Sequence, residues 1–203
     1  MFLLSKINET KLNISYSKII FLALTLACST QPLLAKNKVW AIDKEKTRVQ
    51  FITKRGPNTP AVGTFQNVKG SISYDGKNPE SAKVNATIDT STMSTGVSVR
   101  DEDVKSPRYL NCIKFPTASF CSQKIKKNKE GKYTLTGEFN LHGVKKIVDL
   151  NMEMPKITGK TLSAVATTRL DQRDYKLNFK AMHPDGVIRI DDVILIKILI
   201  WAR

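Results

Sequence analysis

The stretch YTLTGEFNLHGVKKIVDLNMEM, residues 133–154, decides the fold class of this 203-residue chain. Its first half alternates apolar and polar side chains, and the apolar face carries Tyr133, Leu135, Gly137, Phe139 and Leu141. Its second half repeats the alternation with Val148, Leu150, Met152 and Met154. A period of two residues is typical of an antiparallel strand with one buried face. His142-Gly143 between the halves has turn composition, so the stretch predicts two adjacent strands.

The same alternation recurs along most of the chain, with turn-forming residues between the alternating runs. The apolar faces of residues 47–54 and 80–89 carry Val49, Phe51, Ala82, Val84, Ala86 and Ile88. This pattern predicts an all-β fold of about eight to ten strands, many of them long enough to cross a barrel. The last run, residues 191–201, is apolar on nearly both faces, which favours a well-covered closing strand.

One segment departs from this pattern. GVSVRDEDVKSPRYLNCIKFP, residues 96–116, is polar and charged and does not alternate. It predicts a short helix or an ordered loop, and Pro107 limits the length of any helix there. In a barrel, an insertion of this kind often covers an open end, so we expect a lid.

The first residues predict export. Residues 1–35 combine a basic start, an apolar run of about ten residues and small residues near a cut site, as secretory signal peptides do. Cleavage after Ser29 or after Ala35 fits, and lipidation at Cys28 is a third alternative. Residues 36–203 then form one domain, in the periplasm or outside the cell.

The formal net charge of the chain is +15 at pH 7. Export argues against a nucleic-acid partner, so this charge favours anionic lipid, a lipid phosphate or a cell-surface polymer. The alternative is a device for solubility. The basic run at residues 124–132 is either a solvated hairpin tip or a transient contact with an anionic membrane surface.

Two cysteines, Cys112 and Cys121, follow the predicted signal peptide. An oxidising compartment would let them form a disulfide, and the alternative is two separate small buried residues. The sequence holds no CxxC motif and no cluster of cysteine and histidine, so no zinc site is expected.

The ordered set of motifs resembles the YceI-like family. The set comprises VWAID, TRVQFITKR, VGTFQNVKGSISYD, STGVSVRDEDVKSPRYLNCIKFPTASF, GEFNLHGVKKIV, QRDYKLNF and DDVILIKI, and it spans nearly all of residues 39–201. The resemblance implies an exported, lipocalin-like antiparallel barrel of about eight strands, with a short lid, that binds a polyisoprenoid. The chain departs from the family where Glu102 and Asp103 follow Arg100-Asp101, a place where a histidine is frequent. It departs again at Tyr175-Lys176, where a glycine is frequent.

The apolar face of the predicted barrel is the candidate site for the hydrocarbon tail of a ligand. Its residues are Val49, Phe51, Phe65, Val84, Ile88, Leu135, Phe139, Leu150 and Met152. The pattern alone allows an ordinary filled core, whereas the resemblance favours a cavity.

Three residues are candidates for contact with a polar head group. Arg100 suits an oxyanion because its guanidinium binds bidentately, but an ion pair within the lid explains it equally. Arg173 has the same two interpretations, a structural ion pair with Asp174 or a ligand contact. His142 lacks the partners of a metal ligand or a general base, so we interpret it as a strand-end residue first and a head-group contact second.

These features predict an exported carrier or store for an isoprenoid or another long-chain amphiphile, with no cofactor and no catalysis. The alternative is a secreted interaction module with a filled barrel, whose basic surface binds anionic envelope lipids or polymers. The sequence leaves the oligomeric state open, a dimer included.

Overall fold

The structure, a computed structural model, describes residues 37–56, 59–183 and 186–203. The predicted signal peptide at residues 1–35, with its alternative processing positions, lies outside the described residues. The remainder, Lys36–Arg203, forms one compact unit. Within the described part of the chain, no helix has the length and apolar composition that crossing a membrane requires.

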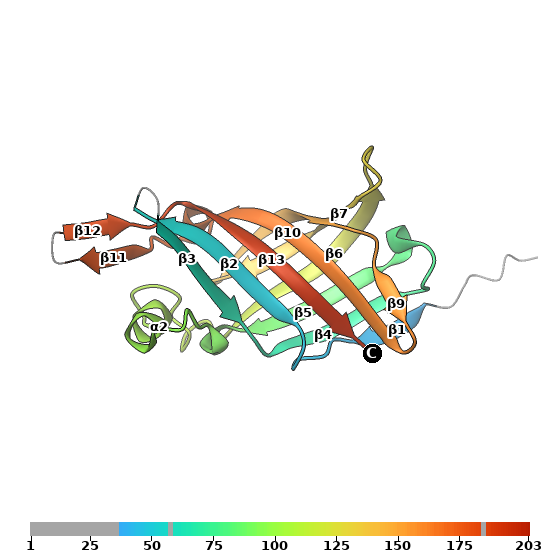
Figure 1. Ribbon diagram of the computed structural model, residues 1–203, viewed down its shortest axis with the longest axis horizontal. Coiled ribbons are helices and arrows are strands. Elements are labelled where there is room, and N and C mark those ends of the chain that lie inside the picture. The colour runs from blue at the N-terminus through green and yellow to red at the C-terminus, as the bar shows by residue number, and fades with distance from the viewer. Residues whose placement is uncertain (1–36, 57–58, 184–185) are drawn as a thin grey trace, which may run out of the picture. The chain divides into compact units, whose positions relative to one another are not determined.

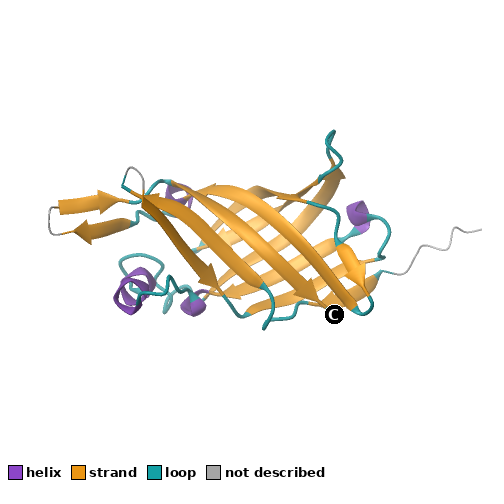
Figure 2. Cartoon of the chain, viewed as in Figure 1, coloured by secondary structure: helices purple, strands orange, loops and turns teal. Residues whose placement is uncertain are grey.

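The described chain is mostly β-structure (Figures 1 and 2). Helix α2 covers Ser98–Lys105, and the short 3₁₀ turns are η1 (Pro79–Ser81), η2 (Thr90–Thr92) and η3 (Gln172–Tyr175). The strands are β1 (Lys38–Ala41), β2 (Arg48–Arg55), β3 (Thr59–Phe65), β4 (Val68–Tyr74), β5 (Lys83–Asp89), β6 (Thr117–Lys127), β7 (Tyr133–Leu141), β8 (Val144–Met152), β9 (Lys156–Thr158), β10 (Thr161–Asp171), β11 (Lys180–His183), β12 (Gly186–Arg189) and β13 (Val193–Ala202).

One antiparallel sheet holds the strands in the order β1-β4-β5-β6-β7-β8-β10-β13-β2-β3, with β9 paired to β10. It curls into a lipocalin-like barrel wall (Figure 1). Ala41 and Arg203 draw β1 to the end of β13, because each backbone N–H donates to the other residue's carbonyl, at 2.8 and 2.9 Å. The predicted all-β antiparallel barrel is therefore confirmed. The described sheet has eleven strands rather than about eight, because the alternation did not reveal short edge strands such as β1 and β9.

The quoted stretch folds as the hairpin β7–β8, in register from Tyr133 opposite Met152 to Leu141 opposite Val144. Its turn residues, His142 and Gly143, have φ angles of 53° and 76°, the pair of positive values that a tight hairpin turn requires. Ladder pairing of β8 stops at Met152.

The row of inward-facing residues on β8 ends before Met154, earlier than the alternation in the sequence predicts. Met154 is 46 % exposed, beyond the end of β8 and just before Pro155. Proline has no N–H to donate to a ladder, which fits an end of pairing there. Met154 is therefore not an inner residue of the barrel.

Two apolar clusters line the interior. The larger lies along the strands and includes Trp40, Ile72, Leu135 and Leu162. The smaller, centred on Met93, Leu110, Tyr175 and Leu177, lies where the segment that follows η2 meets the wall. In Figure 1, α2 and the hairpin β11–β12 lie at one end of the barrel, and the C-terminus lies near the other.

Candidate functional site

The barrel encloses a cavity of about 740 Å³. This volume lies within the range of about 300–1,000 Å³ that small-molecule sites occupy. Alternate residues of nearly every long strand line it, as the period of two predicts. All nine residues predicted to contact a hydrocarbon tail are in the lining: Val49, Phe51, Phe65, Val84, Ile88, Leu135, Phe139, Leu150 and Met152.

The lining is aliphatic along most of its length. Strand β13 contributes alternate isoleucines, Ile194, Ile196, Ile198 and Ile200, and two small residues, Ala164 and Ala166, face the cavity from β10. The rings of Phe51 and Phe65 lie 5.7 Å apart in a tilted arrangement. A surface of this composition is largely apolar, as the walls of lipid and other small-molecule sites are.

Gly63 makes room for one of these rings. A Cβ atom at Gly63 would lie 2.2 Å from Cζ of Phe51, its cross-strand partner. Because that distance is far below van der Waals contact, the Phe51 ring occupies the space that a side chain at position 63 would need. Gly63 therefore sets the position of Phe51 in the cavity.

At the end of the cavity where residues of α2 and the start of β11 contribute to the lining, some of the lining side chains are charged. The cationic ones are Arg55, Arg100, Arg108 and Lys180, and Asp103 is anionic. We call this end the mouth. The sequence analysis identified only Arg100 of the four cations, because Arg55, Arg108 and Lys180 are far apart in the chain and share no motif.

A buried carboxylate ties the start of the lid to the wall. Asp101, 9 % exposed, accepts hydrogen bonds from Ser94 Oγ and Thr95 N, both at 2.8 Å, and from Thr95 Oγ1. Burial raises the pKa of Asp101, but the hydrogen bonds from Thr95 and Ser94 outweigh it and hold the pKa below its usual value. Ser94 in turn pairs through its backbone with Thr64 of β3.

Arg100 belongs to the same network. Its Nε donates to Thr95 Oγ1 at 2.7 Å, and its Nη2 donates to the Thr95 carbonyl at 3.1 Å. These neutral contacts, in place of the alternative ion pair within the lid, hold the guanidinium at the cavity lining. The charge of Arg100 is thus positioned at the mouth.

Aromatic contacts of Tyr109 and Phe115 hold the rest of the lid in place. The Tyr109 hydroxyl donates to the carbonyl of Lys180 at 2.7 Å, and its ring lies 5.3 Å from that of Phe179. The Phe115 ring lies 4.4 Å from the ring of His142. The lid is therefore joined both to the β11 strand and to the turn of the β7–β8 hairpin.

His142 lies outside the cavity lining, in the hairpin turn. Its Nδ1 is 3.2 Å from the Tyr175 carbonyl, and its ring packs on Phe115. Within the described ranges, no group of three or more His, Cys, Asp and Glu side chains is placed to hold a metal ion. These contacts match the strand-end interpretation of His142.

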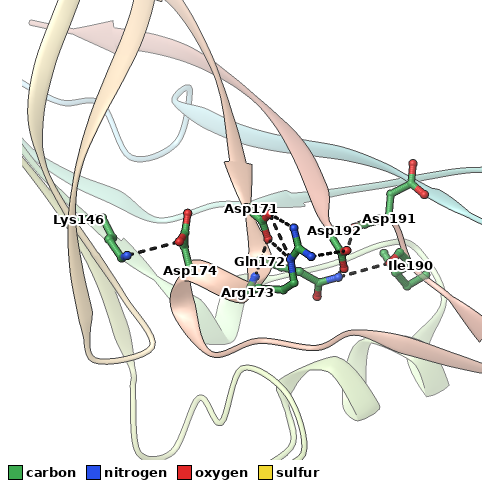
Figure 3. Close-up of polar contacts among 8 residues, drawn as sticks. All are labelled: Lys146, Asp171, Gln172, Arg173, Asp174, Ile190, Asp191 and Asp192. Carbon is green, nitrogen blue, oxygen red and sulfur yellow. Dashed lines mark hydrogen bonds and ion pairs between the residues drawn. The ribbon is translucent and has the colours of Figure 1, made fainter.

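Arg173 also lies outside the lining, exposed in the turn η3 that follows β10 (Figure 3). Its Nε donates to both carboxylate oxygens of Asp171, at 2.9 and 3.2 Å, and its Nη1 is 3.3 Å from Asp192. These hydrogen bonds from Arg173 lower the pKa of Asp171 to about 2. Arg173 thus forms a structural ion pair, but its partners are Asp171 and Asp192 and not the expected Asp174, which pairs with Lys146.

Cys112 and Cys121 are free thiols in the structure. Cys112 packs against the smaller apolar cluster, and Cys121 is exposed on β6. Because Phe120 lines the cavity and side chains alternate, Cys121 faces outward. The structure thus keeps the two residues apart instead of pairing them.

Two tyrosines of the lining escaped the sequence analysis. Tyr74 and Tyr175 are 1 % and 2 % exposed, and neither hydroxyl has a hydrogen-bond partner among the described residues. Burial raises the pKa of Tyr175 to about 12, with a smaller contribution from Asp174. Both phenols therefore stay neutral near pH 7.

A curled antiparallel wall around an apolar cavity, with a charged mouth beside a short lid, defines a lipocalin-like barrel. A sequence model of the YceI-like domain matches residues 40–202. The chain belongs to the YceI-like family, as the motifs predict.

Two bacterial relatives illustrate the similarity. A UPF0312 protein of Yersinia enterocolitica is 39 % identical over 123 residues, which cover 60 % of this chain and 62 % of the relative. A UPF0312 protein of Yersinia pestis is 33 % identical over 156 residues, 76 % of this chain and 74 % of the relative. The chain thus spans less than two thirds of the length of the first relative.

Solved structures share the fold at low sequence identity. BcnA of Burkholderia cenocepacia superposes with a TM-score of 0.70 at 19 % identity, covering 80 % of this chain and 99 % of BcnA. A polyisoprenoid-binding domain of Saccharophagus degradans superposes with a TM-score of 0.62 at 13 % identity, covering 81 % and 97 %. YCEI of Campylobacter jejuni gives 0.55 at 21 % identity, covering 61 % and 75 %.

Proposed function

We propose that the protein holds a polyisoprenoid, or a similar long-chain amphiphile, inside the barrel, for carriage or storage and without catalysis. The observation that carries this proposal is the apolar cavity, lined along its length by aliphatic and aromatic side chains. Membership of the YceI-like family and the fold shared with a polyisoprenoid-binding domain support it.

The size of the cavity argues for an occupant. Its lining exposes apolar side chains from nearly every long strand around about 740 Å³ of space. Burial of a hydrocarbon chain there is favourable by about 25 cal/mol per Å² of apolar surface removed from water. A secreted module with a filled barrel, the alternative function, would have no need of this space.

The mouth gives the ligand an orientation. Four cations and one acid, Asp103, join the lining there, so the polar head of an amphiphile would lie beside Arg100 while its tail follows the isoleucines of β13. Arg100 keeps its place through Thr95 and needs no acidic partner for it. His142 and Arg173 are already occupied by protein contacts outside the lining.

Export to the periplasm or beyond the cell belongs to the same proposal and rests on the features of residues 1–35. It is tested by the mass of the protein isolated from its host. Cleavage after Ser29 or Ala35, or a lipid on Cys28, supports export, and an intact N-terminus in the cytoplasm would refute it.

Two neighbouring substitutions on β5 test the cavity. Ala86 faces the cavity, whereas Thr87 is exposed on the outer face of the same strand. Ala86→Trp should fill the space and abolish loading with an added long-chain polyprenol, measured by native mass spectrometry. Thr87→Trp, the matched control, should load like the wild type. Equal loading of both variants would show that the ligand lies elsewhere.

A further inference from the structure

The outer face of the β10–β13–β2–β3 wall carries a contiguous apolar surface, which the cavity does not explain. Cross-strand register places its residues in rows. One row runs Arg169, Leu195, Ile52 and Val62, and another runs Val165, Leu199 and Arg48. Trp201, opposite Ser163, adds a ring at the end of β13. Because these residues alternate with those that line the cavity, their side chains face outward.

Much of this surface is exposed. Val62, Val165, Leu199 and Trp201 are 41 %, 40 %, 36 % and 41 % exposed. The sequence favoured a well-covered closing strand, because β13 is apolar on both faces. In the described structure only the inner face is enclosed, so the outer face of β13 meets solvent through its large apolar side chains. A contiguous surface of this kind marks an interaction site more often than scattered single residues do.

Basic side chains are interleaved with the apolar ones. Lys197 lies between the two rows, opposite Thr167 and Gln50, while Arg169 and Arg48 end them. The Nζ of Lys46 lies 5.9 Å from the centroid of the Trp201 ring. These rows contain no acidic residue. We call this surface, with Ile52, Val62, Val165, Leu195, Leu199 and Trp201 and the cations Lys46, Arg48, Arg169 and Lys197, the outer wall patch.

The neighbouring β7–β8 hairpin, whose strand β8 pairs with β10, lacks this composition. Its outward pairs include Thr136 with Asp149, Glu138 with Ile147 and Asn140 with Lys145. Ile147 is 56 % exposed, but its cross-strand and flanking neighbours on this face are polar or charged. The basic hairpin tip at residues 124–132 is also different, because it has no exposed large apolar residue. Of these three surfaces, only the β10–β13–β2–β3 wall combines several exposed large apolar side chains with basic ones.

We propose that the outer wall patch docks the barrel on an anionic lipid bilayer. Aliphatic side chains and an indole ring suit the interface region of a bilayer, and interleaved cations meet its phosphates. A second copy of the chain fits less well, because a two-fold interface would bring two copies of the same basic set, Lys197, Arg169 and Arg48, together with no acid in the rows to pair with them. The proposal goes beyond the ligand inside the barrel and does not depend on it.

Flotation with vesicles tests the docking. The purified protein should float with vesicles of phosphatidylglycerol and phosphatidylcholine in equal parts, and not with phosphatidylcholine alone. The double variant Arg169→Glu, Lys197→Glu should bind the mixed vesicles at least about tenfold more weakly. The double variant Lys124→Glu, Lys126→Glu has the same change in net charge on exposed positions of β6 and should stay within about twofold of the wild type.

Two further measurements separate docking from general charge attraction. Leu199→Ser should weaken vesicle binding, whereas Ile147→Ser, on β8 outside the patch, should not. Brominated lipid should quench Trp201 but not the buried Trp40, so quenching should disappear in Trp201→Phe.

Three results would overturn the docking proposal: equal losses in the two charge-reversal variants, no binding to the mixed vesicles, or a dimer that Leu199→Ser converts to a monomer. The two proposals can fail independently. Leu199→Ser, in the outer wall patch, should still load polyprenol. Ala86→Trp, with its cavity filled, should still float with the mixed vesicles.

Discussion

The wall and the lid of this barrel are stabilised in different ways. The wall is a repeated arrangement, in which alternate residues of consecutive strands share one apolar interior. The lid depends on particular contacts: a carboxylate with three donors at its start, and the rings of Tyr109 and Phe115 further on. The difference indicates that the wall tolerates only changes that keep its alternation, whereas single polar substitutions should loosen the lid and leave the wall folded.

The largest effect should come from breaking the alternation in the wall. Leu135 is 3 % exposed inside the barrel, and the adjacent Thr134 faces outward opposite Lys126. Leu135→Asp puts an unpaired charge in an apolar interior and should cost about 3 kcal/mol or more, or prevent folding. Thr134→Asp should change stability by no more than about 0.5 kcal/mol. Urea denaturation compares the two, and similar losses would contradict the assigned faces.

The next effect should separate the lid from the wall. Asp101→Ala leaves Ser94 Oγ and the Thr95 groups without their acceptor and should cost about 1–3 kcal/mol. Amide hydrogen exchange should become faster in Ser98–Lys105 and remain slow in β7 and β8. Uniformly faster exchange throughout the barrel would mean that lid and wall form one cooperative unit. That result would contradict a lid that is stabilised separately from the wall.

A pair of glycines measures how closely the lid contacts the hairpin turn. Gly143 and Gly131 have φ angles of 76° and 80°, so alanine is strained at both. A Cβ at Gly143 would lie 2.8 Å from Cε1 of Phe115, whereas nothing lies within 4 Å at Gly131. Gly143→Ala should therefore cost about 1 kcal/mol more than Gly131→Ala in thermal or urea unfolding. Equal costs would show that Phe115 does not press on the turn.

The smallest effect concerns the exposed ion pair of Arg173 with Asp171. The folded-state pKa of Asp171 is about 2, below its usual 3.8, so its stabilising contribution is present above the usual value. That contribution disappears as the pH falls toward 2. Thermal midpoints of the wild type and Asp171→Asn should differ slightly at pH 7 and converge near pH 2. A difference that grows on acidification would give the opposite sign and refute the assignment.

Much of the wall could be predicted from sequence, because apolar and polar residues alternate along its strands with a period of two. The alternation in residues 133–154 gave the hairpin β7–β8, and the same rule placed Val49, Phe51 and Val84 in the cavity lining. The rule failed at Met154, where Pro155 and the end of β8 interrupt the period. Periodicity also could not decide between a filled interior and a cavity, because both need the same apolar face.

The lid and the mouth could not be predicted in the same way. Their contacts join residues that no local pattern relates, such as Asp101 to Ser94 and Tyr109 to Lys180. Arg173 was expected to pair with Asp174, but its acids are Asp171, at the end of β10, and Asp192, just before β13. Such partners become apparent only when the register of β10 and β13 is known.

The most direct test of the central claim is the identity of the molecule that co-purifies with the protein from its own host. Native mass spectrometry followed by lipid extraction should find an isoprenoid or another long-chain amphiphile in the wild type. The same ligand should be absent from Ala86→Trp and present in Thr87→Trp. Repeated empty preparations of the wild type, or an equal amount of ligand in Ala86→Trp, would contradict a lipid held inside the barrel.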